Sequence, residues 1–404
     1  MVDRISDRLE VGPSSAPISS SGRSERMGES FSVALAERFF VAGSGEENVG
    51  PGEEDPAPAA PPTPTRVSLA QALHCLTVRV RPQAPVQFSL QHIFQPLRST
   101  FAAPQPSLQI RATPVSPSPS AHTLRDFPRP PADNGRGVHW IPTTRQTREV
   151  VDQFMERVQS LGVRWVTFLN EPGDLEGNEY LVRRLTEAGI MPVMRVYTGG
   201  VRAIQEDLTA LVRHYYQLFN EPNMVCENGG ALPDAGRYAA HWIAAARQVV
   251  AGGGLPGFGA LSPQGDVDDV TFLRQVLESI KERGQQHLLD RAWLSVHNYG
   301  QDYLHVREYD RVLQETLGRS LPQIGTEAGI YPGGGVTAED QIRIVTDAYR
   351  YMSRREPYYF AYSLWTVANK AGGGHDERWE PQALYGVDGP SVLAVALEQA
   401  FGRV

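Results

Sequence analysis

From residue 137 onward, short apolar runs alternate with longer stretches in which apolar residues recur every three or four positions. A short run of large aliphatic and aromatic residues is typical of a buried strand, and the longer spacing is typical of an amphipathic helix. Eight strands are predicted, at residues 137–140, 165–169, 191–197, 215–219, 258–261, 293–296, 321–327 and 360–365. Each of them is followed by a stretch with helical spacing.

The predicted helices cover residues 150–161, 180–188, 204–212, 234–250, 270–283, 304–317, 337–353 and 391–401. In the first helix Val151 and Phe154 share one face, and Gly162 supplies the expected stop. Thr337, with Asp340 three residues later, resembles a capping pair at the start of the seventh. Strict alternation of strand and helix predicts an α/β protein whose parallel sheet closes into a (β/α)8 TIM barrel.

The first third of the chain has a different amino-acid composition. Of the 31 prolines, 19 precede residue 134, and stretches such as 51–58 carry few large apolar side chains. Such a segment buries too little surface to offset the entropy of ordering it. We therefore predict a Pro/Ser-rich, mostly disordered extension over residues 1–130 and a catalytic barrel domain over residues 137–404. Residues 67–101 are less extreme and could line a short helix or strand. A chain starting near Arg129 is expected to fold.

Composition excludes several partners. The formal net charge of -8 argues against nucleic acid, because phosphate binding needs clustered Lys and Arg. No apolar run approaches the roughly 20 residues of a membrane span. The two cysteines, Cys75 and Cys226, indicate neither a disulfide framework nor a metal knot. The stretch 1–4 lacks the apolar core of a signal peptide, which predicts a cytoplasmic protein.

Two predicted strands end on a glutamate. The fourth closes in Asn220-Glu221-Pro222, and the seventh closes in Thr326-Glu327. Glycosidic bond hydrolysis needs two carboxyl groups, one to protonate the leaving oxygen and one to attack the sugar or to activate water. These two glutamates are therefore the candidate catalytic pair.

The Asn-Glu-Pro pattern occurs a second time, at residues 170–172. Strand order separates the two copies, because Glu221 follows the fourth predicted strand and Glu171 the second. We interpret Glu171 as a loop carboxylate or a residue near the rim of the cleft.

Taken together in strand order, Asn220–Pro222, His297–Tyr299, Glu327 and Trp365 resemble the clan A glycoside hydrolases, a group that includes the cellulase-like enzymes. The resemblance covers roughly residues 137–404. It implies a (β/α)8 barrel with an acid/base after an Asn at the end of strand 4 and a nucleophile at the end of strand 7. It therefore implies a retaining mechanism with Glu221 as acid/base and Glu327 as nucleophile.

His297 and Tyr299 are two residues apart, so they share one face of the sixth strand. By resemblance, Tyr299 would hydrogen-bond Glu327, and His297 would contact the sugar or a catalytic glutamate; a core histidine is the alternative. Arg195, at the end of the third strand, would orient Glu327 or bind substrate unless it forms an ordinary ion pair. Cellulase-like members often place a His at that strand end and an Arg one strand earlier, so the exact family stays open.

Two further residues are candidate sugar contacts. Asn220 would hydrogen-bond the sugar 2-hydroxyl, or else merely close a turn. Trp365 would form the aromatic floor under the sugar at the cleavage point, or else pack in the core. Beyond it, the glycine-rich loop 372–379 is interpreted as solvated, with Trp379 as a candidate platform; its His-Asp-Glu cluster is too compact to favour a metal.

The sequence thus predicts a retaining glycosidase that acts on an oligo- or polysaccharide and needs no cofactor or metal. A barrel that binds carbohydrate without turnover is one alternative. A barrel hydrolase of another class, such as a metal-dependent one, is the other, and the absence of a His-rich strand end counts against it. The sugar, the linkage, exo or endo cleavage, and the oligomeric state do not follow from the sequence.

Overall fold

The structure is a computed structural model that describes residues 122–209, 215–263, 265–300, 302–332, 335–369 and 379–402. Nearly all of the predicted extension, including the stretch 67–101, lies outside these ranges. So does most of the glycine-rich loop 372–379. The predicted division into an extension and a barrel domain therefore stays a prediction.

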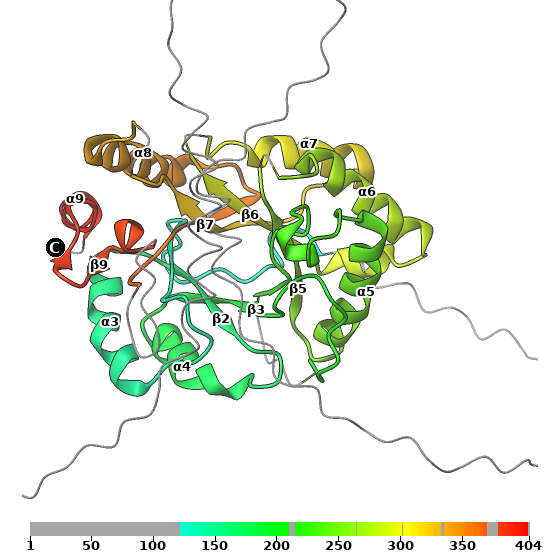
Figure 1. The fold of residues 1–404 in the computed structure, drawn as a ribbon, viewed down its shortest axis with the longest axis horizontal. Coiled ribbons are helices and arrows are strands. Elements are labelled where there is room, and N and C mark those ends of the chain that lie inside the picture. The colour runs from blue at the N-terminus through cyan, green and yellow to red at the C-terminus, as the bar shows by residue number, and fades with distance from the viewer. Residues whose placement is uncertain are drawn as a thin grey trace, which may run out of the picture. The chain divides into compact units, whose positions relative to one another are not determined.

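Eight parallel strands form a closed barrel with helices around it (Figure 1). Each strand pairs with the next, and β8 returns to pair with β1. The predicted (β/α)8 class is confirmed. The strands are β1 (Arg136–His139), β2 (Trp165–Asn170), β3 (Met191–Val196), β4 (Tyr215–Leu218), β5 (Leu255–Leu261), β6 (Trp293–Tyr299), β7 (Gln323–Gly329) and β8 (Tyr359–Leu364).

Seven α-helices are present in the described residues: α3 (Arg148–Ser160), α4 (Glu179–Glu187), α5 (Ala235–Ala251), α6 (Asp269–Glu282), α7 (Val306–Leu317), α8 (Ala338–Tyr351) and α9 (Val392–Phe401). The predicted pair Thr337 and Asp340 forms a capping box at the start of α8. Short 3-10 turns are η2 (Glu176–Asn178), η3 (Cys226–Asn228), η4 (Gln286–Asp290), η5 (Met352–Arg354) and η6 (Glu380–Gln382). Outside the barrel, β9 (Tyr385–Gly386) pairs with β10 (Gly389–Pro390). None of the described helices is long and apolar enough to cross a membrane.

The predicted helix at 204–212 is not found in its described part. Residues 197–209 contain no helix, and residues 210–214 lie outside the described ranges. Asp207 accepts hydrogen bonds from the backbone N–H and the hydroxyl of Thr209, a local turn that competes with helix formation. The backbone N–H of Leu208 donates to the side chain of Gln248 on α5 instead of to a helical carbonyl. The apolar residues of this stretch therefore belong to a loop and not to a helix.

The amino end of the barrel is closed by the segment that precedes β1. Phe127 packs in one apolar cluster with the inward-facing Trp165, Trp293 and other aromatic residues of the strands. The hydroxyl of Tyr215 donates to the carbonyl of Pro128 at 2.7 Å. A second, larger apolar cluster lies between the strands and the helices. The core of the barrel thus includes residues upstream of the predicted domain start at residue 137.

One covalent link was not predicted. Cys226 begins η3 and takes part in a disulfide bond. The other cysteine of the chain, Cys75, lies outside the described residues. The sequence indicated no disulfide framework, and a single bond at Cys226 was not anticipated from it.

Candidate active site

The predicted catalytic residues meet at the carboxyl ends of the strands, opposite the closed amino end. Glu221 follows β4, Glu327 lies within β7, and Trp365 follows β8. Both glutamate residues are buried, with 2% and 0% of their surface exposed. Functional sites of this barrel class are built at that end, because the loops there bring together side chains from several strands.

The backbone before Glu221 departs from strand alternation. Tyr215 packs in the inner cluster and Leu218 in the outer one, so continued alternation would turn Phe219 inward. Instead Phe219 has a φ of 71° and packs in the outer cluster, with its ring 5.7 Å from that of Tyr238. Glu221 itself has a φ of 34°. Non-glycine residues in this region cost about 1–3 kcal/mol each and cluster at functional sites.

Glu327 reaches the site through a bulge in β7. The pairing of β6 with β7 runs from Val296 opposite Gly325 directly to His297 opposite Glu327, which leaves Thr326 as an extra residue. The hydroxyl of Thr326 lies 2.6 Å from that of Ser295 in the barrel interior. Bulges re-aim side chains, and this one brings the next residue, Glu327, to the same interior.

The imidazole of His297 lies between the two carboxylates. Its Nδ1 is 2.8 Å from Oε1 of Glu221, and its Nε2 is 3.7 Å from Oε1 of Glu327. The ring is buried, with 1% of the residue exposed. Both carboxylates therefore face the same imidazole ring.

Two further side chains hold Glu327. The hydroxyl of Tyr299 donates to its Oε2 at 2.7 Å, and the guanidinium of Arg195 forms an ion pair with its Oε1. Burial, together with the charge of Glu327, raises the pKa of Tyr299 well above its ordinary value, so this hydroxyl keeps its proton. A cation and a hydrogen-bond donor both favour an ionised carboxylate. Both contacts therefore favour the ionised form of the Glu327 carboxylate.

Trp365 has a partner that the sequence reasoning missed. His139 ends β1, and its ring centroid lies 4.3 Å from that of Trp365. Its Nδ1 is 2.7 Å from the carbonyl of Trp140, which can only accept, so Nδ1 carries the proton. Burial lowers the pKa of His139 to about 3, and the ring is neutral at ordinary pH. Its place at the carboxyl end of a predicted strand was the signal that could have found it.

On its other side Trp365 meets Trp379, and the two ring centroids are 5.6 Å apart. Trp379 has only 4% of its surface exposed. In the described residues Trp379 therefore supports Trp365, and it does not form a separate exposed platform.

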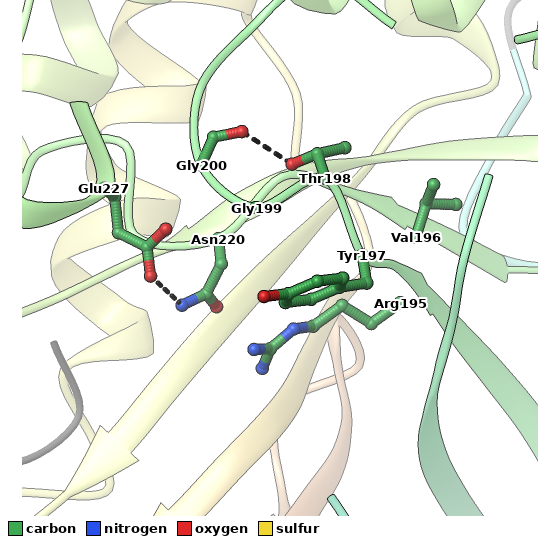
Figure 2. Close-up of a pocket in the computed structure, with 8 residues that line it drawn as sticks. All are labelled: Arg195, Val196, Tyr197, Thr198, Gly199, Gly200, Asn220 and Glu227. Carbon is green, nitrogen blue, oxygen red and sulfur yellow. Dashed lines mark hydrogen bonds between the residues drawn. The ribbon is translucent and has the colours of Figure 1, made fainter. Parts of the chain in front are cut away.

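Asn220 lines a small pocket formed by the end of β3, the loop that follows it and η3 (Figure 2). Its amide Nδ2 donates to Oε1 of Glu227 at 3.0 Å. Glu227 lies in η3 and is buried, and no motif in the sequence pointed to it. The pocket is lined by Arg195, Val196, Tyr197, Thr198, Gly199, Gly200, Asn220 and Glu227.

Glu171 stands apart from this group. Its carboxylate accepts a hydrogen bond from Thr144 and lies 3.7 Å from the guanidinium of Arg145, both in the loop after β1. Its side chain is 45% exposed. The second Asn-Glu-Pro motif therefore provides a loop carboxylate, in agreement with the order of the strands.

Within the described ranges, no group of three or more His, Cys, Asp or Glu residues is arranged to hold a metal ion. The structure brings Glu221, Glu327, His297, Tyr299 and Arg195 into one contact network. Asn220 directly precedes Glu221 and hydrogen-bonds Glu227, and Trp365 contacts His139. The roles of these residues in catalysis and binding stay predictions.

No known protein family and no curated protein matches this chain. Solved structures with a similar fold include an endo-beta-1,3-glucanase of glycoside hydrolase family 128 (subgroup II) from Sorangium cellulosum. It has 17% identity and a TM-score of 0.44, over 67% of this chain and 100% of its own. A family 39 beta-xylosidase from Caulobacter crescentus has 16% identity and a TM-score of 0.46, over 68% of this chain and 72% of its own.

Both of these proteins are glycosidases. The (β/α)8 barrel that the resemblance to clan A glycoside hydrolases implied is observed in the strands of this chain itself. A likeness of this degree says nothing about the reaction. The function has to be inferred from the geometry of the site.

Proposed function

We propose that the protein is a retaining glycoside hydrolase that cleaves O-glycosidic bonds of an oligo- or polysaccharide. The observation that supports this most strongly is the position of His297, which contacts Glu221 on one side and faces Glu327 on the other. Two buried carboxyl groups in different surroundings are what acid and nucleophile roles require.

The surroundings of the two glutamates support different roles for them. Glu327 has a cation and a hydroxyl donor, so it is the ionised nucleophile. Glu221 instead shares a hydrogen bond of 2.8 Å with Nδ1 of His297, so its surroundings differ from those of Glu327 and suit the acid/base role.

The reaction then follows a double displacement. Glu327 attacks the anomeric carbon while Glu221 gives its proton to the leaving oxygen, and the glycosidic bond breaks. A covalent glycosyl-enzyme ester results. Glu221, now ionised, takes a proton from water, and the resulting hydroxide attacks the anomeric carbon and releases Glu327. Two inversions give net retention.

The neighbouring residues orient the reactants. Tyr299 and Arg195 hold Glu327 in one orientation, so less conformational entropy is lost when its carboxylate reaches the geometry for attack. Trp365 is the floor on which the apolar face of the sugar stacks. Asn220, fixed by Glu227, presents its amide oxygen to a sugar hydroxyl.

A panel of aryl glycosides tests the activity, and NMR of the first-formed anomer tests the mechanism. We expect retention. Glu327→Gly should abolish turnover, and azide should restore it on an activated substrate, giving a glycosyl azide of inverted configuration. An inverted first-formed sugar from the unaltered enzyme would contradict the mechanism, and sugar binding without turnover would indicate a binding barrel instead.

A further inference from the structure

We infer that Asn223 is a positioning residue for Glu221. Its side chain fixes the turn after β4 and thereby holds the glutamate in its left-handed backbone conformation against His297. This role rests on the proposed function, because it concerns the acid/base of that reaction. Asn223 lies two residues after Glu221 and is completely buried. Neither the sequence motifs nor the similar proteins assign a role to it.

The side chain of Asn223 is surrounded by the backbone of the loop between β5 and α6. Its Nδ2 donates to the carbonyls of Ser262 and Val267, at 2.8 and 3.0 Å. Its Oδ1 accepts from the N–H of Ser262 at 2.9 Å, and its own carbonyl accepts from the N–H of Val267 at 3.1 Å. Both hydrogens of the amide and its oxygen are thus used. The turn after Glu221 is therefore fastened to this loop.

The same loop leaves room for Asn223 and adds a further contact beyond it. A Cβ at Gly265 would lie 2.3 Å from Nδ2 of Asn223, so a larger residue there would displace the amide. The carboxylate of Asp266 accepts from the N–H of Val225 at 2.6 Å. The fit between the two loops therefore depends on a glycine as well as on the asparagine.

Glu221 needs such an anchor because its own conformation is unfavourable. It has a φ of 34°, and a non-glycine residue keeps such a conformation only where its surroundings enforce it. On its amino side, Asn220 pairs with Ala260 of β5 in a parallel bridge. On its carboxyl side, the N–H of Met224 donates to the carbonyl of Glu221 at 2.9 Å, which closes a turn that contains Asn223. On this second side the amide of Asn223 connects the turn to the rest of the barrel.

Loss of this anchor would act on proton transfer. The carboxyl group of Glu221 lies 2.8 Å from Nδ1 of His297. When the turn relaxes, that group moves relative to the leaving oxygen, and a displacement of about 1 Å can cost about 100-fold in rate. Glu327 is held by Tyr299 and Arg195, which belong to other strands, so the nucleophile should stay in place. The defect should therefore be specific to the step that needs an acid.

Kinetics of Asn223→Ala on a matched pair of aryl glycosides provides the test. With a poor leaving group, kcat/KM should fall by about 100-fold, because cleavage of that substrate depends on protonation. With an activated leaving group, kcat/KM should stay within a few-fold of that of the unaltered enzyme. An asparagine with a merely structural role would lower both values by the same factor.

Asn178→Ala is the matched control. Asn178 is also a buried asparagine, and its amide donates to the carbonyl of Leu169 and to the side chain of Asn170, in the second Asn-Glu-Pro copy. Its removal costs a similar set of hydrogen bonds and alters no contact of the turn after Glu221. The ratio of the two kcat/KM values should therefore stay at that of the unaltered enzyme, even where urea unfolding shows a similar loss of stability.

Gly265→Ala is a second variant, which disturbs the same amide from the other side and serves if Asn223→Ala does not fold. It should change the ratio of the two kcat/KM values in the same direction. A readout that does not need turnover is the 15N NMR spectrum of the labelled histidine rings, in which Glu221→Gln identifies the signals of His297. Asn223→Ala and Gly265→Ala should shift these signals, and Asn178→Ala should not.

Two results would overturn the inference. One is hydrolysis by the unaltered enzyme with equal losses on both leaving groups in the folded variants, which would leave the proposed function intact. The other is a set of His297 signals that is unchanged in folded Asn223→Ala and Gly265→Ala. Shifted His297 signals in a protein that turns over no aryl glycoside would support the positioning of Glu221 while refuting hydrolysis.

Discussion

At the residue scale, local backbone and neighbours decide the roles of two identical tripeptides. Asn220-Glu221-Pro222 follows a left-handed Phe219, and its glutamate is buried against His297. The copy at 170–172 leaves Glu171 half exposed beside Arg145. Strand order alone distinguished them in the sequence. The positive φ values of Phe219 and Glu221 could not be predicted from the sequence, because phenylalanine and glutamate give no sign of such a conformation.

Glutamine substitutions test this difference. Glu221→Gln should lower kcat/KM by roughly 10²–10⁴-fold on aryl glycosides with poor leaving groups, which need protonation, and much less on activated ones. Glu171→Gln should stay within a few-fold of the unaltered enzyme on both. Steady-state kinetics on a matched pair of leaving groups gives the answer, and a large loss in Glu171→Gln alone would reverse the assignment.

At the element scale, the eight strands can be predicted from their apolar runs. Two other features, one loop and one bulge, cannot. The stretch 204–209 has helical spacing but forms a loop, because Asp207 and Thr209 close a local turn. The bulge in β7 could not be predicted either, because the sequence around Thr326 and Glu327 fits a regular strand as well as a bulged one. What sequence periodicity cannot supply is the phase of a strand after a bulge or a left-handed residue.

A contact between α6 and α7 gives a pH dependence at this scale. Asp269 accepts hydrogen bonds from His305 at 2.6 Å and Tyr309 at 2.5 Å. Burial opposes ionisation of Asp269, but these bonds outweigh it and lower its pKa below 3.8. The hydrogen bond to Asp269 raises the pKa of His305 above 6.5, and Asp302 and Glu308 add to the effect.

The two shifts define a window of stabilisation. The contribution of Asp269 is present above its unfolded value and is lost as the pH falls through its folded pKa. That of His305 is present below 6.5 and is lost as the pH rises through its folded pKa. Urea unfolding should therefore show His305→Gln losing about 1.5–3 kcal/mol at pH 5.5 and less at pH 8.5. The exposed His287→Gln is the control, and a pH-independent loss would contradict the ion pair.

At the scale of the whole molecule, the barrel has a closed end and a working end. Phe127 and Pro128 cover the amino ends of the strands, where Tyr215 and other aromatic residues gather. Arg129 adds a cation over the ring of Phe360, 3.6 Å from its centroid. These contacts involve only a few residues of a proline-rich stretch. A prediction from composition therefore assigned those residues to the extension and not to the barrel.

Two truncated chains test the closed end, both with Cys226→Ser to remove the remaining thiol. A chain starting at His122 should fold and keep its activity. One starting at Arg129 lacks Phe127 and the carbonyl that binds Tyr215, and it should be less stable by about 3–5 kcal/mol. Phe127→Ala in the full chain should reproduce most of that loss in urea unfolding. Equal stability of the two truncated chains would mean that the covering segment is dispensable.

The extra residue in β7 has a consequence for how this barrel can change over generations. Point substitutions do not change which residues of a strand face inward. The neighbours of Glu327 can therefore be substituted without turning its side chain away from the barrel interior. A single-codon deletion at Thr326 would place Glu327 directly after Gly325, which pairs with the outward-facing Val296, so the regular pleat itself would keep Glu327 turned inward opposite His297. An insertion of one residue between Thr326 and Glu327 would instead shift the register by one more position, and the direction of Glu327 is therefore sensitive to added residues and not to the loss of the extra one.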